Sequence, residues 1–219
     1  MWSRLSLFSG NSNHLLTERV CRELGVNPGK SLVGRFSDGE IRVEIHENVR
    51  GKDTYILQST CPPVNENLME LLVLIDALKR ASARRVNAVI PYYGYGRQDQ
   101  KDKPRVAIGA KMVADLLAVA GADRVITMEL HADQIQGFFK IPVDNLQGTA
   151  IFAAELKPLL RGDEIIVAPD SGGVERARLF ASMLKLDLAL MDYREENGHY
   201  PRIVGNVKGR RVIIFDDMV

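Results

Sequence analysis

The segment IVAPDSGGVERA, residues 166–177, joins an apolar run to a glycine-rich turn and then to the start of a helix. Paired glycines such as Gly172 and Gly173 let backbone N–H groups approach a ligand closely. The N-terminus of a helix starting near Val174 adds free donors and partial positive charge, which favour a phosphate. A carboxylate beside phosphate, here Asp170, suggests a hard cation such as Mg²⁺. The competing interpretation is an ordinary strand-to-helix turn in which the aspartate caps the helix.

The segment IPYYGYGRQDQKDKPR, residues 90–105, carries a second set of groups that suit a nucleotide. It has no GxxxxGK[ST] pattern and is therefore not a P-loop. The Arg97 guanidinium suits bidentate contact with phosphate oxygens, and Tyr92, Tyr93 or Tyr95 is suited to flank a base. A plain surface loop remains an equal alternative for this segment.

Three further groups follow predicted strands or turns. In ELHADQIQGFF, residues 129–139, His131 lies just past a strand, and in the final VIIFDDMV, residues 212–219, two aspartates do. Ligands of open α/β sheets bind at the carboxyl ends of the strands, which favours a site there. A lone histidine is nevertheless more often structural. The turn FSDGE, residues 36–40, reads equally as a hairpin turn.

The elements that must position these residues alternate between strand and helix. We expect strands at Leu5–Phe8, Ser31–Phe36, Ile41–Ile45, Tyr55–Leu57, Val86–Pro91, Val125–Met128, Glu164–Ala168, Leu188–Met191 and Arg211–Phe215, and helices at 13–24, 65–83, 107–120, 150–160 and 174–186. Such alternation predicts an α/β fold whose mostly parallel sheets are flanked by helices. A break near 144–148 divides it into domains 1–146 and 147–219, the second with an unfinished sheet.

Two helices show a clear apolar face. In residues 65–83 the stripe contains Leu68, Leu71, Leu72, Ile75 and Leu78. In residues 107–120 we expect Ile108, Val113, Leu116 and Leu117 to face inward. Spacings of three and four residues bring such side chains onto one side of a helix.

The composition excludes several classes of protein. The net charge of +1 gives no electrostatic signature of nucleic-acid binding, and no apolar run approaches the ~20 residues of a membrane span. The N-terminus is too short and polar for a signal peptide. Cys21 and Cys61 are isolated, which indicates buried, reduced thiols in a cytoplasmic protein. We therefore expect neither a nucleic acid nor a membrane as partner.

Taken together and in order, five segments closely resemble the ribose-phosphate diphosphokinase family, also called phosphoribosyl pyrophosphate synthetases. They are FSDGEIRVEIHENVRG, QSTCPPVNENLMELLVLIDALKRASA, VIPYYGYGRQD, ELHADQIQGFF and APDSGGVERA. The resemblance implies two type I phosphoribosyltransferase-like domains, the second incomplete here. It also implies transfer of the diphosphoryl group of ATP to C1 of ribose 5-phosphate with Mg²⁺ as cofactor, which gives 5-phosphoribosyl 1-diphosphate and AMP. Family members form dimer-based hexamers, so self-association is expected.

The resemblance also implies roles for particular residues. Phe36 is expected to stack on adenine, and the turn residues Asp38, Gly39 and Glu40 to read its polar edge, in the site of a neighbouring subunit. Arg97 and Gln98 match positions that hold ATP, His131 and Asp170 match Mg²⁺ ligands, and Asp216 and Asp217 match acids that hold the ribose hydroxyls.

The sequence departs from the family pattern in its last third. Tyr193 and Glu195 occupy the family's catalytic Lys and Arg positions, so no catalytic residue is assigned. A glutamate there would repel phosphates that a cation would stabilise. The phosphate loop expected after Asp216-Asp217-Met218 is missing, so we expect uncovered apolar faces and a chain that aggregates or needs partner subunits. One alternative is therefore an impaired or regulatory homologue that assembles with an active synthetase. A phosphoribosyltransferase that consumes the diphosphate is a weaker one, since such enzymes need no ATP site.

Overall fold

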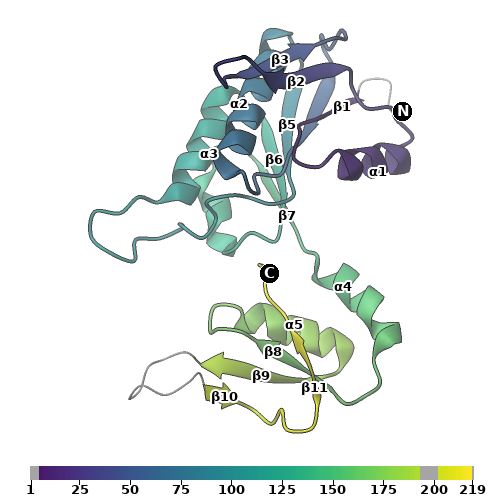
Figure 1. The fold of residues 1–219 in the computed structure, drawn as a ribbon, viewed down its shortest axis with the longest axis vertical. Coiled ribbons are helices and arrows are strands. Elements are labelled where there is room, and N and C mark those ends of the chain that lie inside the picture. Colours follow the sequence, from purple (N-terminus) through teal and green to yellow (C-terminus); the bar gives the residue numbers. More distant parts are fainter. Residues whose placement is uncertain (1–4, 193–201, 219) are drawn as a thin grey trace. The chain divides into compact units, whose positions relative to one another are not determined.

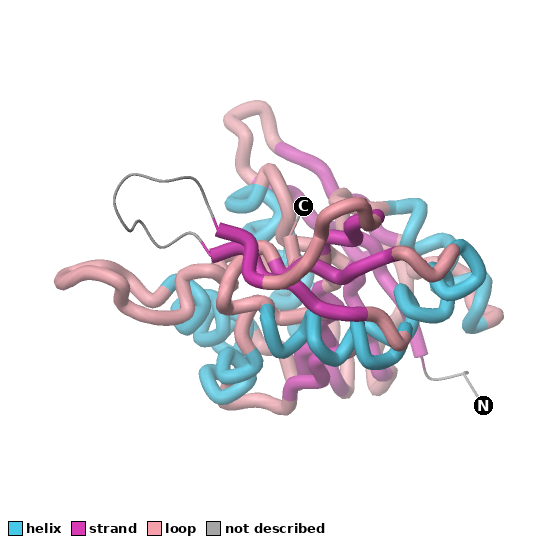
Figure 2. The backbone as a smooth tube through the Cα atoms, turned by 90° about the horizontal axis from the view of Figure 1, so that it is seen from below, coloured by secondary structure: helices cyan, strands magenta, loops and turns pink. Residues whose placement is uncertain are grey.

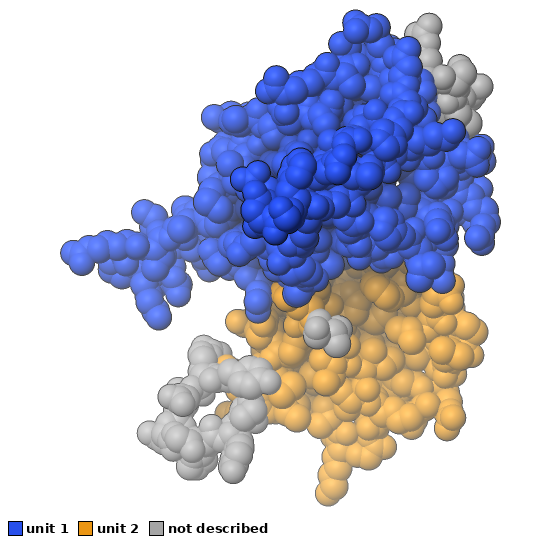
Figure 3. All heavy atoms as spheres, turned by 45° about the horizontal axis from the view of Figure 1, so that its top comes forward, with its two compact units in different colours: residues 1–146 blue, residues 147–219 orange. Residues whose placement is uncertain are grey.

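The computed structural model describes residues 5–192 and 202–218 and divides the chain into two compact units, residues 1–146 and 147–219. Figure 3 colours the two units separately. Each unit is built around its own sheet, and the two are described in turn below.

Unit 1 contains a five-stranded sheet in the order β1-β4-β5-β6-β7, in which all neighbouring strands are parallel. Its strands are β1 (Leu5–Ser9), β4 (Asp53–Leu57), β5 (Arg85–Ile90), β6 (Arg124–Met128) and β7 (Val143–Leu146). A separate antiparallel hairpin pairs β2 (Ser31–Arg35) with β3 (Ile41–Ile45). Because the five strands are parallel, their carboxyl ends share one edge of the sheet, which is where ligands of such folds bind.

Three α-helices cover this sheet: α1 (His14–Leu24), α2 (Val64–Arg80) and α3 (Gly109–Ala120). Right-handed connections from β4 to β5 and from β5 to β6 place α2 and α3 on one face. After α1 the chain returns beside the outer edge of β1, at the Leu7–Pro28 bridge, so α1 lies on the other face (Figure 1). The Asn13 side chain accepts a hydrogen bond from Leu16 N at 3.0 Å and so caps α1.

The predicted helix faces are only partly correct. In α2, Leu68, Leu71, Ile75 and Leu78 are buried as expected, whereas Leu72 is half-buried and Leu74, which is outside the predicted stripe, is fully buried. In α3, Val113 and Leu117 are buried, but Leu116 is 38% exposed. The helices are embedded between the sheet and their neighbours, so their buried faces are wider than a single stripe of spacings predicts.

Unit 2 contains a four-stranded sheet in the order β10-β9-β8-β11. Its elements are α4 (Thr149–Leu156), the 3₁₀ turn η2 (Lys157–Leu159), β8 (Glu164–Ala168), α5 (Val174–Leu184), β9 (Asp187–Asp192), β10 (Arg202–Val204) and β11 (Arg211–Ile214). Strands β9 and β11 are parallel to β8, and β10 is antiparallel to β9. The Phe180 ring of α5 stacks on Phe215 with ring centroids 4.2 Å apart, which joins the helix to the end of β11.

Two strands and one short 3₁₀ helix were not predicted from the sequence. Strand β7 (Val143–Leu146) runs into the segment near 144–148 that was expected to be a break, and β10 was not predicted at all. The turn η1 (Asp133–Phe138) follows β6. Among the described thiols, Cys21 is buried as expected but Cys61 is only half-buried. None of the described helices is long and apolar enough to cross a membrane.

Candidate active site

The loops that follow β5 and β6 lie against each other at the carboxyl edge of the unit 1 sheet. A Cβ atom built on Gly96 would lie 3.7 Å from the Cβ of His131 and 3.0 Å from the carbonyl oxygen of Tyr93. Gln134 Nε2 donates a hydrogen bond to Asp99 Oδ2 at 3.1 Å, which ties the two loops together. The structure therefore brings His131 close to the loop that carries Arg97 and Gln98, and a side chain at Gly96 would be crowded by the Tyr93 carbonyl rather than by His131.

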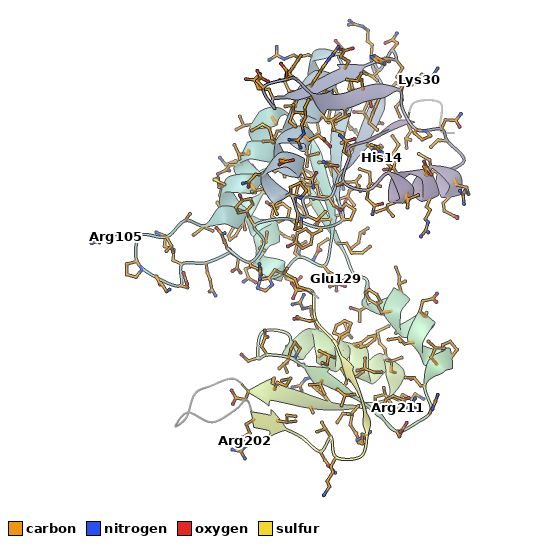
Figure 4. All side chains as sticks on the ribbon, viewed as in Figure 1. His14, Lys30, Arg105, Glu129, Arg202 and Arg211 are labelled. Atoms are coloured by element: carbon orange, nitrogen blue, oxygen red, sulfur yellow. The ribbon has the colours of Figure 1, made fainter. Side chains whose placement is uncertain are left out.

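Two hollows open beside Arg97 and Gln98. One, of about 490 Å³, is lined by Val64, Tyr92, Tyr95, Gly96, Arg97 and Gln98. The other, of about 380 Å³, uses the same arginine and glutamine on the loop that leads to α3. This loop, on which Arg105 is labelled, extends away from the sheet (Figures 2 and 4). Volumes in this range are typical of small-molecule sites.

Tyr93 does not belong to this surface. It is 6% exposed, and its hydroxyl donates a hydrogen bond to the Ala110 carbonyl at 2.9 Å inside the core. Burial raises the pKa of Tyr93, as expected for a phenol removed from water. Of the three tyrosines considered as base-flanking groups, Tyr92 and Tyr95 line the hollow and Tyr93 is a core residue.

Asn145 of β7 holds the His131 loop from both sides. The Leu130 backbone N–H donates to Asn145 Oδ1 at 3.1 Å, and Asn145 Nδ2 donates to Asp133 Oδ1 at 3.3 Å. Glu129, labelled in Figure 4, has φ +46°, an uncommon backbone conformation for a residue other than glycine. Side-chain bonds on either side of His131 therefore fix a strained loop, and the sequence prediction, which missed β7, gave no indication of them.

The FSDGE turn connects β2 to β3 and is exposed. Gly39 has φ +95°, which a turn at this position requires, and the Glu40 N–H donates to Asp38 Oδ1 at 3.1 Å. Phe36 is 51% exposed, and the Arg42 guanidinium lies over its ring, 5.7 Å from the ring centroid. The turn thus presents an aromatic face and two carboxylates on its surface.

A buried polar cluster that the sequence did not suggest supports the same edge of the sheet. Glu70 of α2 is 4% exposed, and its carboxylate accepts hydrogen bonds from Asn11 N at 2.6 Å, Asn11 Nδ2 at 2.7 Å and Gln58 Nε2 at 2.7 Å. Gln58 is fully buried and accepts from Ser12 N at 3.1 Å. These bonds fix the loop after β1 against the end of β4.

In unit 2, three aspartates lie at the carboxyl ends of β8 and β11. Asp170 Oδ1 accepts a hydrogen bond from the N–H of Gly173 at 2.9 Å, but the N-cap of α5 is Gly173 itself, so Asp170 is not the cap of this helix. Asp216 is exposed, whereas the Asp217 side chain is 7% exposed and pairs with Arg176 at 2.8 Å. Burial raises the pKa of Asp216, and the negative charges of Asp217 and Asp170 act in the same direction.

The donor sets fit a magnesium ion that also binds a phosphate ligand. Among residues 5–192 and 202–218, no three His, Cys, Asp or Glu side chains gather as a metal cage. Mg²⁺ commonly uses only one or two protein carboxylates together with water and substrate phosphates, so Asp170 beside the Gly172–Gly173 turn suits it. Tyr193 and Glu195, at the family's catalytic positions, lie outside the described residues.

Comparison with known proteins decides the family. The model of the N-terminal domain of ribose phosphate pyrophosphokinase matches residues 5–121. Ribose-phosphate pyrophosphokinase of Burkholderia pseudomallei is 54% identical over 219 residues, which covers 98% of this chain and 69% of that protein. The chain belongs to the ribose-phosphate pyrophosphokinase family. The enzyme of Ralstonia nicotianae is 55% identical, with the same coverage, and that of Thermosipho africanus is 54% identical over 99% of this chain and 70% of its own length.

A solved structure confirms the expected fold class. The crystal structure of phosphoribosylpyrophosphate synthetase from Mycobacterium smegmatis matches with a TM-score of 0.93 and 42% identity, over 98% of this chain and 72% of that one. The chain thus spans about 70% of the length of these relatives. All of them carry the name of the enzyme, which favours a pyrophosphokinase over a regulatory homologue or a phosphoribosyltransferase.

Proposed function

We propose that the chain acts as a ribose-phosphate pyrophosphokinase. The C1 hydroxyl oxygen of ribose 5-phosphate attacks the β-phosphorus of ATP, the bond from that phosphorus to the α-phosphate oxygen breaks, and AMP leaves. The hydroxyl proton is released, and the products are 5-phosphoribosyl 1-diphosphate and AMP. Identity above 50% to relatives that carry this enzyme's name is the observation that supports the proposal most strongly.

The proposed ATP contacts are Arg97 and Gln98 in the hollow of unit 1, together with Phe36, Asp38, Gly39 and Glu40 of the β2–β3 turn. The support from geometry is that Arg97 and Gln98 line both hollows, the larger of which Tyr92 and Tyr95 also line. An arginine that contacts phosphate oxygens in two places positions the chain of phosphates and stabilises the charge that develops on it. Phosphoryl transfer depends mainly on such positioning and charge neutralisation, because the protein contributes little covalent chemistry.

His131 of unit 1 and Asp170 of unit 2 are proposed as magnesium ligands, each argued within its own unit. A bound Mg²⁺ would polarise phosphate oxygens and help to neutralise the charge of the transferring group. Asp170 directs one oxygen to the Gly173 N–H, which orients the carboxylate without occupying both oxygens in that bond. The loop that carries His131 is fixed by Asn145, as the orientation of a ligand requires.

Asp216 and Asp217 are the proposed contacts of ribose 5-phosphate. Self-association, in the form of dimer-based hexamers, is proposed because the exposed Phe36 turn would then serve a neighbouring subunit's ATP site. A cytoplasmic location is likewise proposed. No catalytic residue is assigned, since the corresponding positions are Tyr193 and Glu195.

The test is the release of AMP from ATP by the purified chain, with Mg²⁺, in the presence and absence of ribose 5-phosphate. We expect AMP only with the sugar phosphate, in equal amount to 5-phosphoribosyl 1-diphosphate. Arg97→Ala should lower kcat/KM for ATP at least ~100-fold, since one lost charge-stabilising donor typically costs that much. Lys103→Ala, on the same loop but outside both linings, is the matched control. No AMP above a protein-free reaction would refute catalysis by this chain.

A further inference from the structure

Thr60 is a buried residue in the loop that follows β4, and its side chain bonds to the loop that follows β5. The residue is 1% exposed. Its hydroxyl donates a hydrogen bond to the Tyr92 carbonyl at 3.0 Å and accepts one from the Gly94 N–H at 2.6 Å. A hydroxyl has one proton to donate and lone pairs that accept, so it is used here in both senses. One side chain therefore bonds the neighbouring loop at two places.

The backbone of Thr60 packs against the same segment. Its N–H donates to the Tyr92 carbonyl at 2.9 Å, and a Cβ atom built on Gly94 would lie 2.5 Å from the Thr60 carbonyl oxygen and 2.9 Å from Val64 Cγ1. Glycine at position 94 thus allows the two loops to approach closely. If the hydroxyl were removed, the Tyr92 carbonyl would keep its bond to the Thr60 N–H, whereas the Gly94 N–H would lose the hydroxyl as its partner.

Gly94 directly precedes the turn that leads to Arg97. Tyr95 has φ +64°, which is uncommon for a residue other than glycine, and its carbonyl accepts a hydrogen bond from the Gln98 N–H at 3.0 Å. The Tyr95 hydroxyl donates to Asn65 Oδ1 of α2. A strained backbone conformation persists only where the surrounding structure holds it. The bond between Thr60 and Gly94 therefore helps to fix the direction in which the chain enters this turn.

We propose that Thr60 is a positioning residue of the ATP site, whose hydroxyl holds the Gly94 N–H and so places Arg97 and Gln98 in the hollow that they line. The proposal rests on the proposed function for the identity of the ligand, whereas the bond to Gly94 does not. Without the hydroxyl, a buried donor loses its partner, and the loop must shift for that donor to find another. A small displacement of groups that position a substrate is enough to weaken binding and slow the reaction.

Three variants of the full chain separate this role from general stability. Thr60→Val keeps the shape of the side chain and removes the hydroxyl, whereas Thr60→Ser keeps the hydroxyl. Thr54→Val is the matched control, because Thr54 is fully buried and its hydroxyl donates to the Arg85 carbonyl at 2.9 Å, where β4 and β5 begin. Both valine variants lose a buried hydroxyl bonded to a backbone carbonyl, but only Thr60→Val changes the edge of the sheet at which the hollows lie.

The bond itself is tested by native-state hydrogen exchange, read at single amides by NMR without any ligand. The Gly94 amide of the wild-type chain should be protected, because its exchange requires local opening of a buried bond. Thr60→Val should speed its exchange at least ~10-fold, since a lost hydrogen bond of ordinary strength corresponds to about that factor. Thr60→Ser and Thr54→Val should retain the protection. An unprotected Gly94 amide in the wild type, or unchanged exchange in Thr60→Val, would overturn the bond.

The positioning role is tested by calorimetry with ATP and Mg²⁺ and by the release of AMP. Thr60→Val should raise the Kd and the KM for ATP ~10-fold or more, while the KM for ribose 5-phosphate stays unchanged. Thr60→Ser and Thr54→Val should bind ATP as the wild type does. If Thr60→Val binds ATP as tightly as Thr54→Val, the positioning role is overturned although the proposed function stands. If the wild-type chain neither binds ATP nor releases AMP, the proposed function fails together with this role.

Discussion

Glu70 is a buried carboxylate that depends wholly on hydrogen bonds, and its removal should be among the most damaging single changes in unit 1. The side chain is 4% exposed and accepts three hydrogen bonds of 2.6–2.7 Å, two from Asn11 and one from Gln58. No ion pair with a lysine or arginine is described for it. We therefore expect Glu70→Ala to release the loop after β1 and to destabilise the fold.

The loss of stability in Glu70→Ala depends on which of the freed hydrogen-bond donors can bond to water instead. Asn11 is exposed, so its side-chain amide rehydrates in the variant. Gln58 is fully buried, and its Nε2 retains bonds to the Asn67 carbonyl at 3.2 Å and, more weakly, to Asn67 Oδ1 at 3.5 Å. Hydrogen bonds to a charged group contribute ~1.5–3 kcal/mol each, so partial rehydration leaves a net loss of ~3–4 kcal/mol. Glu70→Gln keeps the shape but directs an amide N–H₂ at donors, and should cost ~1–2 kcal/mol.

The assay is urea unfolding followed by circular dichroism, together with hydrogen exchange. Exchange is needed because the two units can unfold separately, and it assigns the loss to the loop at residues 10–13. Glu18→Ala, on the exposed side of α1, is the control and should stay within ~0.5 kcal/mol of the wild type. If Glu70→Ala also stayed within that range, the reasoning from its buried hydrogen bonds would be wrong.

Three other changes test separate parts of the structure. Asn145→Ala removes both bonds beside His131 and should raise the Mg²⁺ concentration needed for half-maximal activity ~10-fold or more, with the melting temperature as control readout. A hydrogen bond from Arg211 lowers the pKa of Asp163 below its ordinary 3.8, so the pair stabilises the fold above that pH and the contribution is lost as pH falls through the lowered pKa. Asp163→Asn should therefore lower the melting temperature near pH 7 but not near pH 2, and an equal deficit at both would refute this origin. Phe180→Ala should cost ~3–5 kcal/mol by leaving a cavity in the unit 2 core. The loss is measured as faster native-state hydrogen exchange of the α5 amides.

The regular part of the fold could be predicted because its signals are local. Buried parallel strands such as Glu164–Ala168 are short apolar runs, and the expected bounds of that strand match the structure. The missed strand β7 reads VDNL, in which two of four residues are polar. Asp144 is accommodated there by an ion pair with Arg124 of the neighbouring strand, and Asn145 by the His131 loop. A strand is difficult to predict from apolar patterns when it contains polar residues whose hydrogen-bond or ion-pair partners are distant in the sequence.

The candidate site shows a similar limit. The sequence placed the candidate ligand-binding groups at the ends of strands, because position after a strand is a local property. It gave no means of separating Tyr93 from Tyr92 and Tyr95, since which ring enters the core depends on contact with Ala110 of α3. It also gave no indication of Glu70, whose polar partners come from the loop after β1 and the end of β4.

The aspartates after β11 show how far identical neighbouring residues can differ once the chain is folded. Asp217 Oδ1 accepts a hydrogen bond from Arg176 of α5, whereas Asp216 Oδ1 accepts the backbone N–H of Asp217 and lies near Gly173, the residue before α5. Arg176 accounts for the orientation of Asp217, because a nearby anion offsets the unfavourable position of a guanidinium in the first turn of a helix and Asp217 is the acid that it contacts. A mutation of Arg176 should therefore change the orientation of Asp217, one of the proposed ribose 5-phosphate contacts, although Arg176 itself is not a proposed contact. Its effect would pass through the orientation of Asp217 and the N–H that this residue donates to Asp216.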